Sequence, residues 1–353
     1  MTLAGLLELG FEPAGNEPRV VEAGWSGDRF ALAVERPGMG TRIGISLRAD
    51  SPDRASRAAE QALTLMDRLV GLLNRYDSSS ALTLLNDAGS LADSPPELTR
   101  VVDLALRLGR RTSGAFDPTV APLVDLFGGG VPRVPSGVAG IAERPGGRGL
   151  RDHPAPDPRD LADIMALIGP EHVGRDGRTI AFQREGVRLT LDGVAKGWIV
   201  DAMAESLEND GVRDYLVDAG GDIRAAGRPE PGRPWTVAVQ DPELRDAWPD
   251  VVGMGGGALA TSGSYEFYFD PERTRHHIVA GQLGASPVEA ASVTVSASTA
   301  ATADALATAV FVLGAGAGIR LIEGLAGCEC LMIGSDGARF ETSGWSALSL
   351  QGR

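Results

Sequence analysis

The stretch from Ser292 to Gly314 constrains the fold most, because its residue pattern changes from that of a strand to that of a helix. Its first residues alternate hydroxyl and apolar side chains with a period of two, which predicts a half-buried strand. A helix is predicted from Ala301 on, and on it Asp304 and Thr308 share one face. A carboxylate and a hydroxyl beside a strand end can bind a hard divalent cation. The alternative is a solvated helix face with the Thr hydroxyl bonded to its own turn.

The net negative charge of the chain argues against polyanionic partners. The 353 residues carry a formal net charge of −14, and Lys and Arg occur in no cluster longer than a pair. Binding to nucleic acid or to an anionic membrane is therefore not expected. Hydrophobic residues make up 43% of the chain, as in globular proteins, and its length suits one large domain or two smaller ones.

The sequence predicts a cytoplasmic protein without membrane insertion. No continuous apolar run reaches the length of about 18 residues that a spanning helix needs. The segment 1–15 carries Glu8 and Glu12 and lacks a basic region, so we expect no signal peptide. Cys328 and Cys330 lie in an apolar run typical of a strand, where they point the same way, and this favours two reduced thiols.

Turns containing Gly and Pro separate the predicted elements. The turn at 37–41 joins two predicted strands and is either a close approach to a ligand or a plain hairpin. One-faced helices are predicted at 53–75 and after 94–97, where the spacing of Ser94 and Glu97 is that of a capping box. Prolines and a glycine between 113 and 123 exclude a continuous helix or central strand there, which leaves peptide groups available to a ligand.

The segment 186–207 predicts a strand over 186–191, a glycine turn and a helix. Unpaired amides and the positive helix end then meet, which makes an anion site plausible, and Lys196 adds a full charge. A Gly/Pro-rich surface loop is predicted at 128–158. His276 and His277 alternate across a predicted strand, so they form a poor chelating pair and we expect no multi-histidine metal site.

Taken in order, these segments resemble the ApbE family of FAD:protein FMN transferases. The resemblance extends over about residues 34 to 335. Its matching pieces are Met39 to Thr41, Tyr76 with Ser80 and Asn86, Ala115 to Val120 with Pro122 to Val124, Leu191 to Gly197, Gly220 to Ile223, Trp235 to Pro242, Ala260 to Tyr265, His277 with Ile278, and Ala303 to Thr308.

The resemblance implies an α+β fold, a mixed flavin-transferase architecture with antiparallel-rich sheets and flanking helices, unlike a Rossmann domain. We expect one such domain over residues 29–345 that includes the loop at 128–158. Residues 1–28 would then be an N-terminal extension and residues 346–353 a C-terminal tail.

The resemblance also implies the site and the reaction. Magnesium would be bound by Asp304 and Thr308, with backbone oxygens near Gly193 and Ala307. It would neutralise the FAD diphosphate while a Thr or Ser hydroxyl of an acceptor protein attacks the FMN phosphorus and AMP leaves. The catalytic residues would be Asp304 and His277, the latter assisting proton transfer unless it is an ordinary strand histidine. The implied FAD-binding residues are Met39, Tyr76 (as a stacking platform), Ala115, Phe116, Asp117, Asp192, Lys196, Ile278 and Val279.

Three positions depart from the family pattern. Thr190 replaces a carboxylate, and Asp192 two residues later offers one in compensation. Ala280 and Leu283 replace a carboxylate and a hydroxyl after His277. Three functions therefore stay open: an active transferase, a magnesium-dependent FAD pyrophosphatase that gives FMN and AMP, and an FAD-binding protein without transfer activity.

Overall fold

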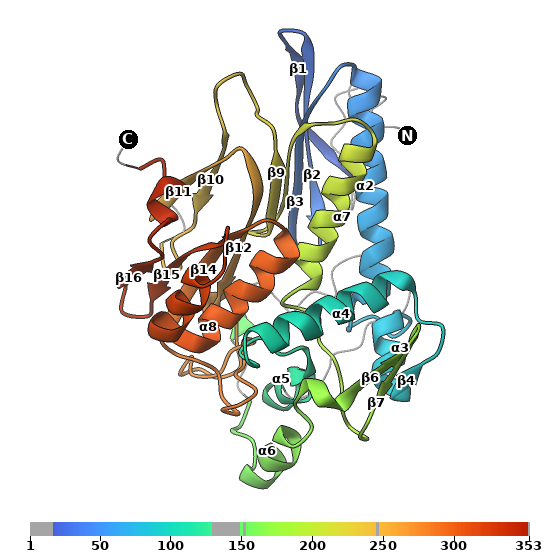
Figure 1. The fold of residues 1–353 in the computed structure, drawn as a ribbon, viewed down its shortest axis with the longest axis vertical. Helices are drawn as coiled ribbons and strands as arrows, with labels where there is room; N and C mark the ends of the chain where they lie inside the picture. The colour runs from blue at the N-terminus through green and yellow to red at the C-terminus, as the bar shows by residue number, and fades with distance from the viewer. Residues whose placement is uncertain (1–16, 129–148, 151–152, 245–246, 352–353) are drawn as a thin grey trace.

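A nine-stranded sheet forms the centre of the computed structural model, which describes residues 17–128, 149–150, 153–244 and 247–351 (Figure 1). Its neighbouring strands all pair antiparallel, which confirms the predicted antiparallel-rich α+β architecture. In spatial order the strands are β1 (Arg19–Ser26), β2 (Arg29–Gly38), β3 (Thr41–Ala49), β8 (Asp214–Ala219), β9 (Ile223–Ala226), β12 (Gly256–Gly263), β14 (Ala290–Ala297), β15 (Glu329–Gly334) and β16 (Arg339–Glu341).

Three long helices pack against this sheet, and their apolar faces form the core. They are α2 (Pro52–Leu73), α7 (Ala195–Asn209) and α8 (Ala300–Glu323). Figure 1 shows α2 and α7 side by side, and α7 in turn contacts α8. The Ser51 side chain caps α2 by accepting a hydrogen bond from the Arg54 amide. The helix predicted at 53–75 is therefore confirmed, and it ends two residues earlier than predicted.

Smaller elements surround this frame. A helix predicted after the prolines at 95–96 is α4 (Pro96–Arg111), which crosses near the start of α8 (Figure 1). The remaining elements are α3 (Ala81–Ala88), β4 (Ser90–Leu91), η1 (Pro118–Val120), α5 (Ala121–Phe127), β5 (Gly149–Leu150), α6 (Pro158–Met165), η2 (Pro170–His172), β6 (Val173–Asp176), β7 (Thr179–Phe182), β10 (Trp235–Val239), β11 (Asp250–Met254), η3 (Ser264–Glu266), β13 (Phe267–Tyr268) and η4 (Trp345–Ala347).

The run from Ser292 forms a strand and then a helix, as predicted, but its strand is more deeply buried than expected. Ser292 and Thr294 of β14 are buried as well as the valines beside them. The reason is that β14 lies inside the sheet, with α8 on one face and a cluster that includes Trp235 and Trp345 on the other. The alternation of hydroxyl and apolar residues therefore predicted correctly which way each side chain points. It did not predict that both faces of this strand are covered.

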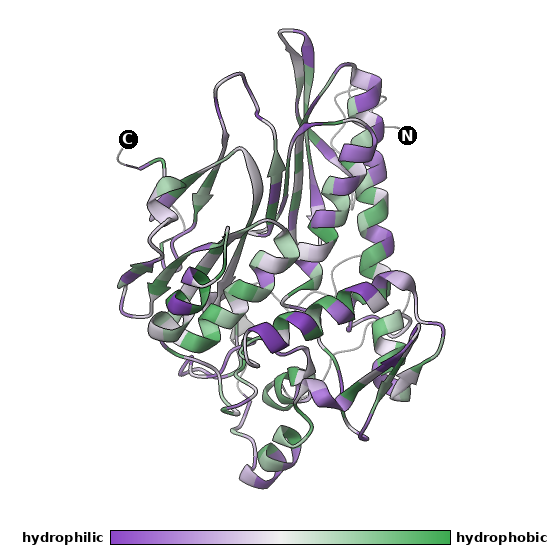
Figure 2. Ribbon diagram, viewed as in Figure 1, coloured by the Kyte–Doolittle hydropathy of each residue, from purple (hydrophilic) through white to green (hydrophobic). Residues whose placement is uncertain are grey.

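Helix α8 has the length and the mean hydropathy of a membrane-crossing helix, and Figure 2 shows it mostly white to green. It packs against β12, β14 and β15, and Val310 and Phe311 are fully buried there. These contacts are those of the core helix of a folded domain. A kink interrupts the helix at Gly314, whose φ of 72° suits glycine, and the Glu289 carboxylate accepts the amide of the next residue.

Several local predictions were wrong. Strand β1 lies within the predicted extension over 1–28 and pairs with β2, so the sheet begins at Arg19. Near the other end of the chain the Ser349 hydroxyl donates to Asp250, and the assignment of 346–353 as a tail stays a prediction. Ser94 forms no capping box: within the described part of the chain its buried hydroxyl has no hydrogen-bond partner, and α4 begins after Pro95 instead.

The predicted strand over 186–191 is an extended segment rather than part of a sheet. The Asn86 side chain takes the place of a neighbouring strand, because its amide bonds both the N–H and the C=O of Leu189. The segment 113–123 avoids a strand as predicted but contains η1 and the start of α5, with Pro122 in the first turn. Most of the loop at 128–158 lies outside the described residues. Cys328 and Cys330 are free thiols, as expected.

Candidate active site

Two turns meet at one end of the central sheet. The β2–β3 turn is a hairpin that passes through Met39 and Gly40, both with positive φ. The β8–β9 turn contains Gly220, where a Cβ would overlap the side chain of Thr41. Glycine is therefore required at 220 both for its φ of 65° and for this close approach. The interpretation of 37–41 as a hairpin is confirmed. A close approach of this turn to a ligand stays a prediction.

Two buried carboxylates, Asp304 of α8 and Asp222 of the β8–β9 turn, lie together beside a lysine of α7. The Gly197 amide donates to Asp304 Oδ2 at 3.2 Å, and Lys196 Nζ lies 3.7 Å from Asp222 Oδ2. Asp304 is 6% exposed and Asp222 is 1% exposed, so the solvated-face alternative is wrong for Asp304. Burial, reinforced by the negative charge of Asp222, raises the pKa of Asp304 well above its ordinary value. A cation at this place would stabilise the ionised carboxylate.

Two hydroxyl groups and the loop at Gly193 lie close together at the next turn of α8. Thr308 Oγ1 lies 3.3 Å from Ser262 Oγ. A Cβ on Gly193 would come within 3.0 Å of Thr308 Oγ1 and 3.3 Å of the Phe116 ring, so glycine lets this loop approach α8 without crowding these side chains. The predicted residues Phe116, Gly193 and Thr308 are thus brought together.

This donor set fits magnesium. The described residues contain no group of three or more His, Cys, Asp or Glu placed to hold a metal ion, so a cation here depends on hydroxyl and carbonyl oxygens as well as on Asp304. Magnesium prefers hard oxygen ligands and is usually bound by one or two carboxylates together with substrate phosphates and water. Asp222 and Ser262 lie in segments that match the family, but they were not among the predicted site residues. The position of Asp222 directly after a double glycine was the available signal.

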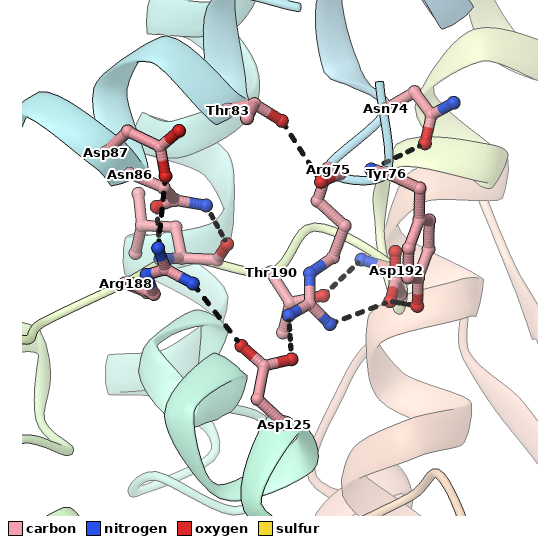
Figure 3. Close-up of polar contacts among 11 residues, drawn as sticks. Asn74, Arg75, Tyr76, Thr83, Asn86, Asp87, Asp125, Arg188, Thr190 and Asp192 are labelled. Carbon is pink, nitrogen blue, oxygen red and sulfur yellow. Dashed lines mark hydrogen bonds and ion pairs between the residues drawn. The ribbon is translucent and has the colours of Figure 1, made fainter. Parts of the chain in front are cut away.

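A charged network anchors the segment before this glycine loop (Figure 3). The guanidinium of Arg75, whose side chain is 3% exposed, pairs with Asp125 and lies 3.8 Å from Asp192. Arg188 bridges Asp125 and Asp87. Burial opposes the charge of Arg75, but Asp192 and Asp125 outweigh it and raise the pKa of Arg75. Burial raises the pKa of Asp125 as well, so this carboxylate depends on its arginines to stay ionised.

Tyr76 lies at the rim of this network. Its hydroxyl donates to Asp192 Oδ2 at 3.3 Å, and the Arg75 guanidinium lies 5.3 Å from the centre of its ring (Figure 3). Asp192 in turn donates its amide to Thr190 Oγ1 at 3.2 Å. Thr190, a departure from the family pattern, and Asp192 therefore form one local unit, in which Thr190 bonds the turn and the Asp192 carboxylate accepts the Tyr76 hydroxyl.

The 115–117 segment joins the core to a cleft. Ala115 and Phe116 are buried in the main core, whereas the Asp117 carboxylate caps η1 by accepting both the amide and the hydroxyl of Thr119. Burial raises the pKa of Asp117. Asp117 also lines a cleft of about 480 Å³, which Gln282 lines as well.

The two adjacent histidines differ in environment. His276 is buried, accepts the Ile278 amide at Nδ1 and bonds the Pro287 carbonyl through Nε2, so its proton lies on Nε2. Its ring is 5.6 Å from that of Phe311, which places the segment against α8. The half-buried His277 lies 3.4 Å from the Phe267 carbonyl through Nδ1, and Ile278 and Val279 are buried.

We expect His276 to make the protein less stable in mild acid. Burial lowers the pKa of His276, so the folded protein keeps it neutral while the unfolded chain protonates near pH 6.5. This stabilisation is present above pH 6.5 and is lost as the pH falls toward the folded pKa. Between pH 7.5 and 5.5 it should change the free energy of unfolding by about 1 kcal/mol. Urea unfolding of His276→Gln should lack this part of the pH dependence; identical pH dependences would contradict the assignment.

Comparison with known proteins places this geometry in a family. The model of the ApbE family matches residues 39–332. The chain belongs to the ApbE family. It is similar to the FAD:protein FMN transferase of Salmonella typhimurium, with 33% identity over 88% of this chain and 87% of the relative. The Escherichia coli K12 protein of the same name is 32% identical to this chain, over 88% of this chain and 86% of that protein.

Solved ApbE structures share the fold. The flavin transferase ApbE from Vibrio cholerae superposes with a TM-score of 0.75 and 27% identity, over 91% of this chain and 99% of that one. The ApbE protein from Thermotoga maritima superposes with a TM-score of 0.78 and 26% identity, over 91% of this chain and 100% of that one. These likenesses confirm the predicted family and fold.

Proposed function

We propose that this chain transfers FMN from FAD to a Thr or Ser hydroxyl of an acceptor protein, with Mg²⁺, and releases AMP. Two relatives with the name FAD:protein FMN transferase align with 88% of this chain. The observation that carries the proposal is the convergence of Asp304, Thr308 and the Gly193 loop beside Lys196 at the start of α7. The acceptor hydroxyl, the metal and the expected cytoplasmic location remain predictions.

Different residues would bind the cation, bind the diphosphate and accept the proton. Asp304 and Thr308 would hold the cation, whose charge would offset that of the diphosphate and of the departing AMP. Lys196 and the amides of the first turn of α7 favour an anion at the same place. The acceptor oxygen forms a bond to the FMN phosphorus, and the bond from that phosphorus to the oxygen bridging to AMP breaks. His277 would accept the proton of the hydroxyl, a role suited to a half-buried imidazole.

A transfer assay tests the proposal. The purified chain is incubated with FAD, MgCl₂ and a domain that bears an acceptor threonine, and intact-mass spectrometry follows the acceptor. We expect a mass gain equal to FMN and an equal amount of AMP, both abolished by EDTA and restored by added Mg²⁺. A Thr→Val acceptor is the control.

The same assay separates the two alternatives. Leu283, one of the departures, is 71% exposed, and Ala280 is buried in a tight turn, so neither offers a polar group to an acceptor. AMP release without a gain in acceptor mass would indicate a pyrophosphatase. Bound flavin with neither product would indicate a binding protein, and either result would contradict transfer.

Tyr76 is expected to contribute to FAD affinity through its ring. Base-to-aromatic stacking is worth about 1 kcal/mol or more, so Tyr76→Ala should raise the dissociation constant for FAD by about fivefold or more. Tyr76→Phe is the matched control, because it keeps the ring and removes only the hydrogen bond to Asp192. Quenching of flavin fluorescence measures both. An unchanged constant in Tyr76→Ala would exclude the stacking role.

A further inference from the structure

Helices α7 and α8 each supply a carboxylate to the N-terminus of the other. Asp304 of α8 accepts the Gly197 amide in the first turn of α7 at 3.2 Å. Asp201 of α7 accepts the Ala300 amide at 2.8 Å through Oδ1 and the Ala301 amide at 2.9 Å through Oδ2. The first amides of a helix have no partner within the helix, so these bonds satisfy groups that would otherwise be exposed or unpaired.

The start of α8 is held from several sides at once. A Cβ on Gly197 would overlap the Ala300 backbone, so the two helices are in closest contact at this point. The Thr299 side chain accepts the Thr302 amide. Arg224 on β9 donates to the Ser298 carbonyl and lies 3.9 Å from Asp201, whose side chain is 14% exposed. Asp201 therefore links α7 to the start of α8, directly after the connection from β14.

We propose that Asp201 is a positioning residue for the cation site, an inference that rests on the proposed function. Asp304 follows Ala300 and Ala301 by about one turn and Thr308 follows by about two. A bidentate cap on the first two amides therefore sets where both oxygen ligands stand relative to the Gly193 loop and Lys196. Ligand positions must be held to about 0.5 Å for a site to work, and an uncapped first turn frays.

The test measures Mg²⁺ itself as the ligand. For the wild type, Asp201→Asn and Asp201→Ala, we would record the rise in melting temperature on adding MgCl₂ and the Mg²⁺ concentration that gives half-maximal FMN transfer. Asn keeps one acceptor oxygen and Ala keeps none. We expect the Mg²⁺ requirement to rise by about tenfold in Asp201→Asn and further in Asp201→Ala, as for other residues that orient metal ligands. The Mg²⁺-dependent rise in melting temperature should shrink in parallel.

Glu205→Gln is the matched control. Glu205 is an exposed carboxylate one turn further along α7, so its substitution should leave the Mg²⁺ requirement unchanged. The dissociation constant for FAD measured without Mg²⁺ should also stay within about twofold in Asp201→Asn, because Asp201 faces the start of α8.

The outcomes distinguish the two proposals. If the wild type shows neither Mg²⁺-dependent turnover nor a Mg²⁺-dependent melting shift, the metal site is wrong and the role of Asp201 with it. If the wild type responds and Asp201→Asn melts lower but needs the same Mg²⁺ concentration, Asp201 is an ordinary helix cap and the positioning role alone is overturned. Should Asp201→Ala fail to fold, Asp201→Asn decides.

Discussion

Asp304→Ala is expected to abolish magnesium-dependent turnover while the protein stays folded. A metal ion that stabilises the charge of a transition state contributes several kcal/mol, so its loss should lower turnover by about 10²- to 10⁴-fold. Asp304 accepts the Gly197 amide in the first turn of α7 and stands one helical turn before Thr308 on α8. Stopped assays of AMP release at saturating FAD, with Mg²⁺ varied, measure the effect.

Stability should change little in this variant, because two effects oppose each other. Removing Asp304 relieves the cost of a buried carboxylate, whose pKa burial raises, but it also leaves the Gly197 amide without its acceptor. Asp304→Asn is the matched control, since it keeps an acceptor for that amide and loses only the charge. We expect Asn to be as inactive as Ala. Turnover that remains unchanged in Asp304→Ala would remove Asp304 from the metal site.

The helices and turns around the site were predictable because they depend on local features of the sequence, the spacing of apolar residues and the positions of glycines. The apolar spacing of 53–75 determines the buried face of α2 whatever that face meets, and the glycines at 40 and 220 mark turns that other residues would strain. The placing of Asp304 and Thr308 on one helix also followed from spacing. Their closeness to Gly193 came from the family resemblance, since spacing within one helix says nothing about a loop more than 100 residues away.

What sequence reasoning missed depends on partners distant in the chain. The alternation of 186–191 is real, but Asn86 replaces the neighbouring strand, and no local pattern reports that. Asp201 and Ala300 are 99 residues apart, and Arg75 and Asp125 are 50 apart. Ser94 and Glu97 have the spacing of a capping box, yet Pro95 and Pro96 place the helix start one residue later. Tertiary contacts decide such cases over local propensity.

Arg75→Met is expected to destabilise the protein by about 3–5 kcal/mol, the usual cost of removing one partner from a buried ion pair. Met keeps much of the length and volume of the side chain, so the loss is one of charge and hydrogen bonding. It leaves Asp125 without its closest cation and Asp192 without one of its partners. Urea unfolding at pH 7 measures the change. Burial already raises the pKa of Asp125, so protonation of this carboxylate should relieve part of the deficit as the pH is lowered toward 5.

Arg68→Met is the matched control, because Arg68 pairs with Glu97 on the surface at 2.9 Å and its side chain is 53% exposed. That substitution should cost less than about 1 kcal/mol. Arg75→Met combined with Asp125→Leu should recover much of the loss, since no unpaired carboxylate then remains at position 125. Equal costs for Arg75→Met and Arg68→Met would contradict the view that a buried ion pair holds α5 and the 186–192 segment to the end of α2. Without that anchor, Asp192 and Tyr76 would have no fixed place at the rim of the proposed flavin site.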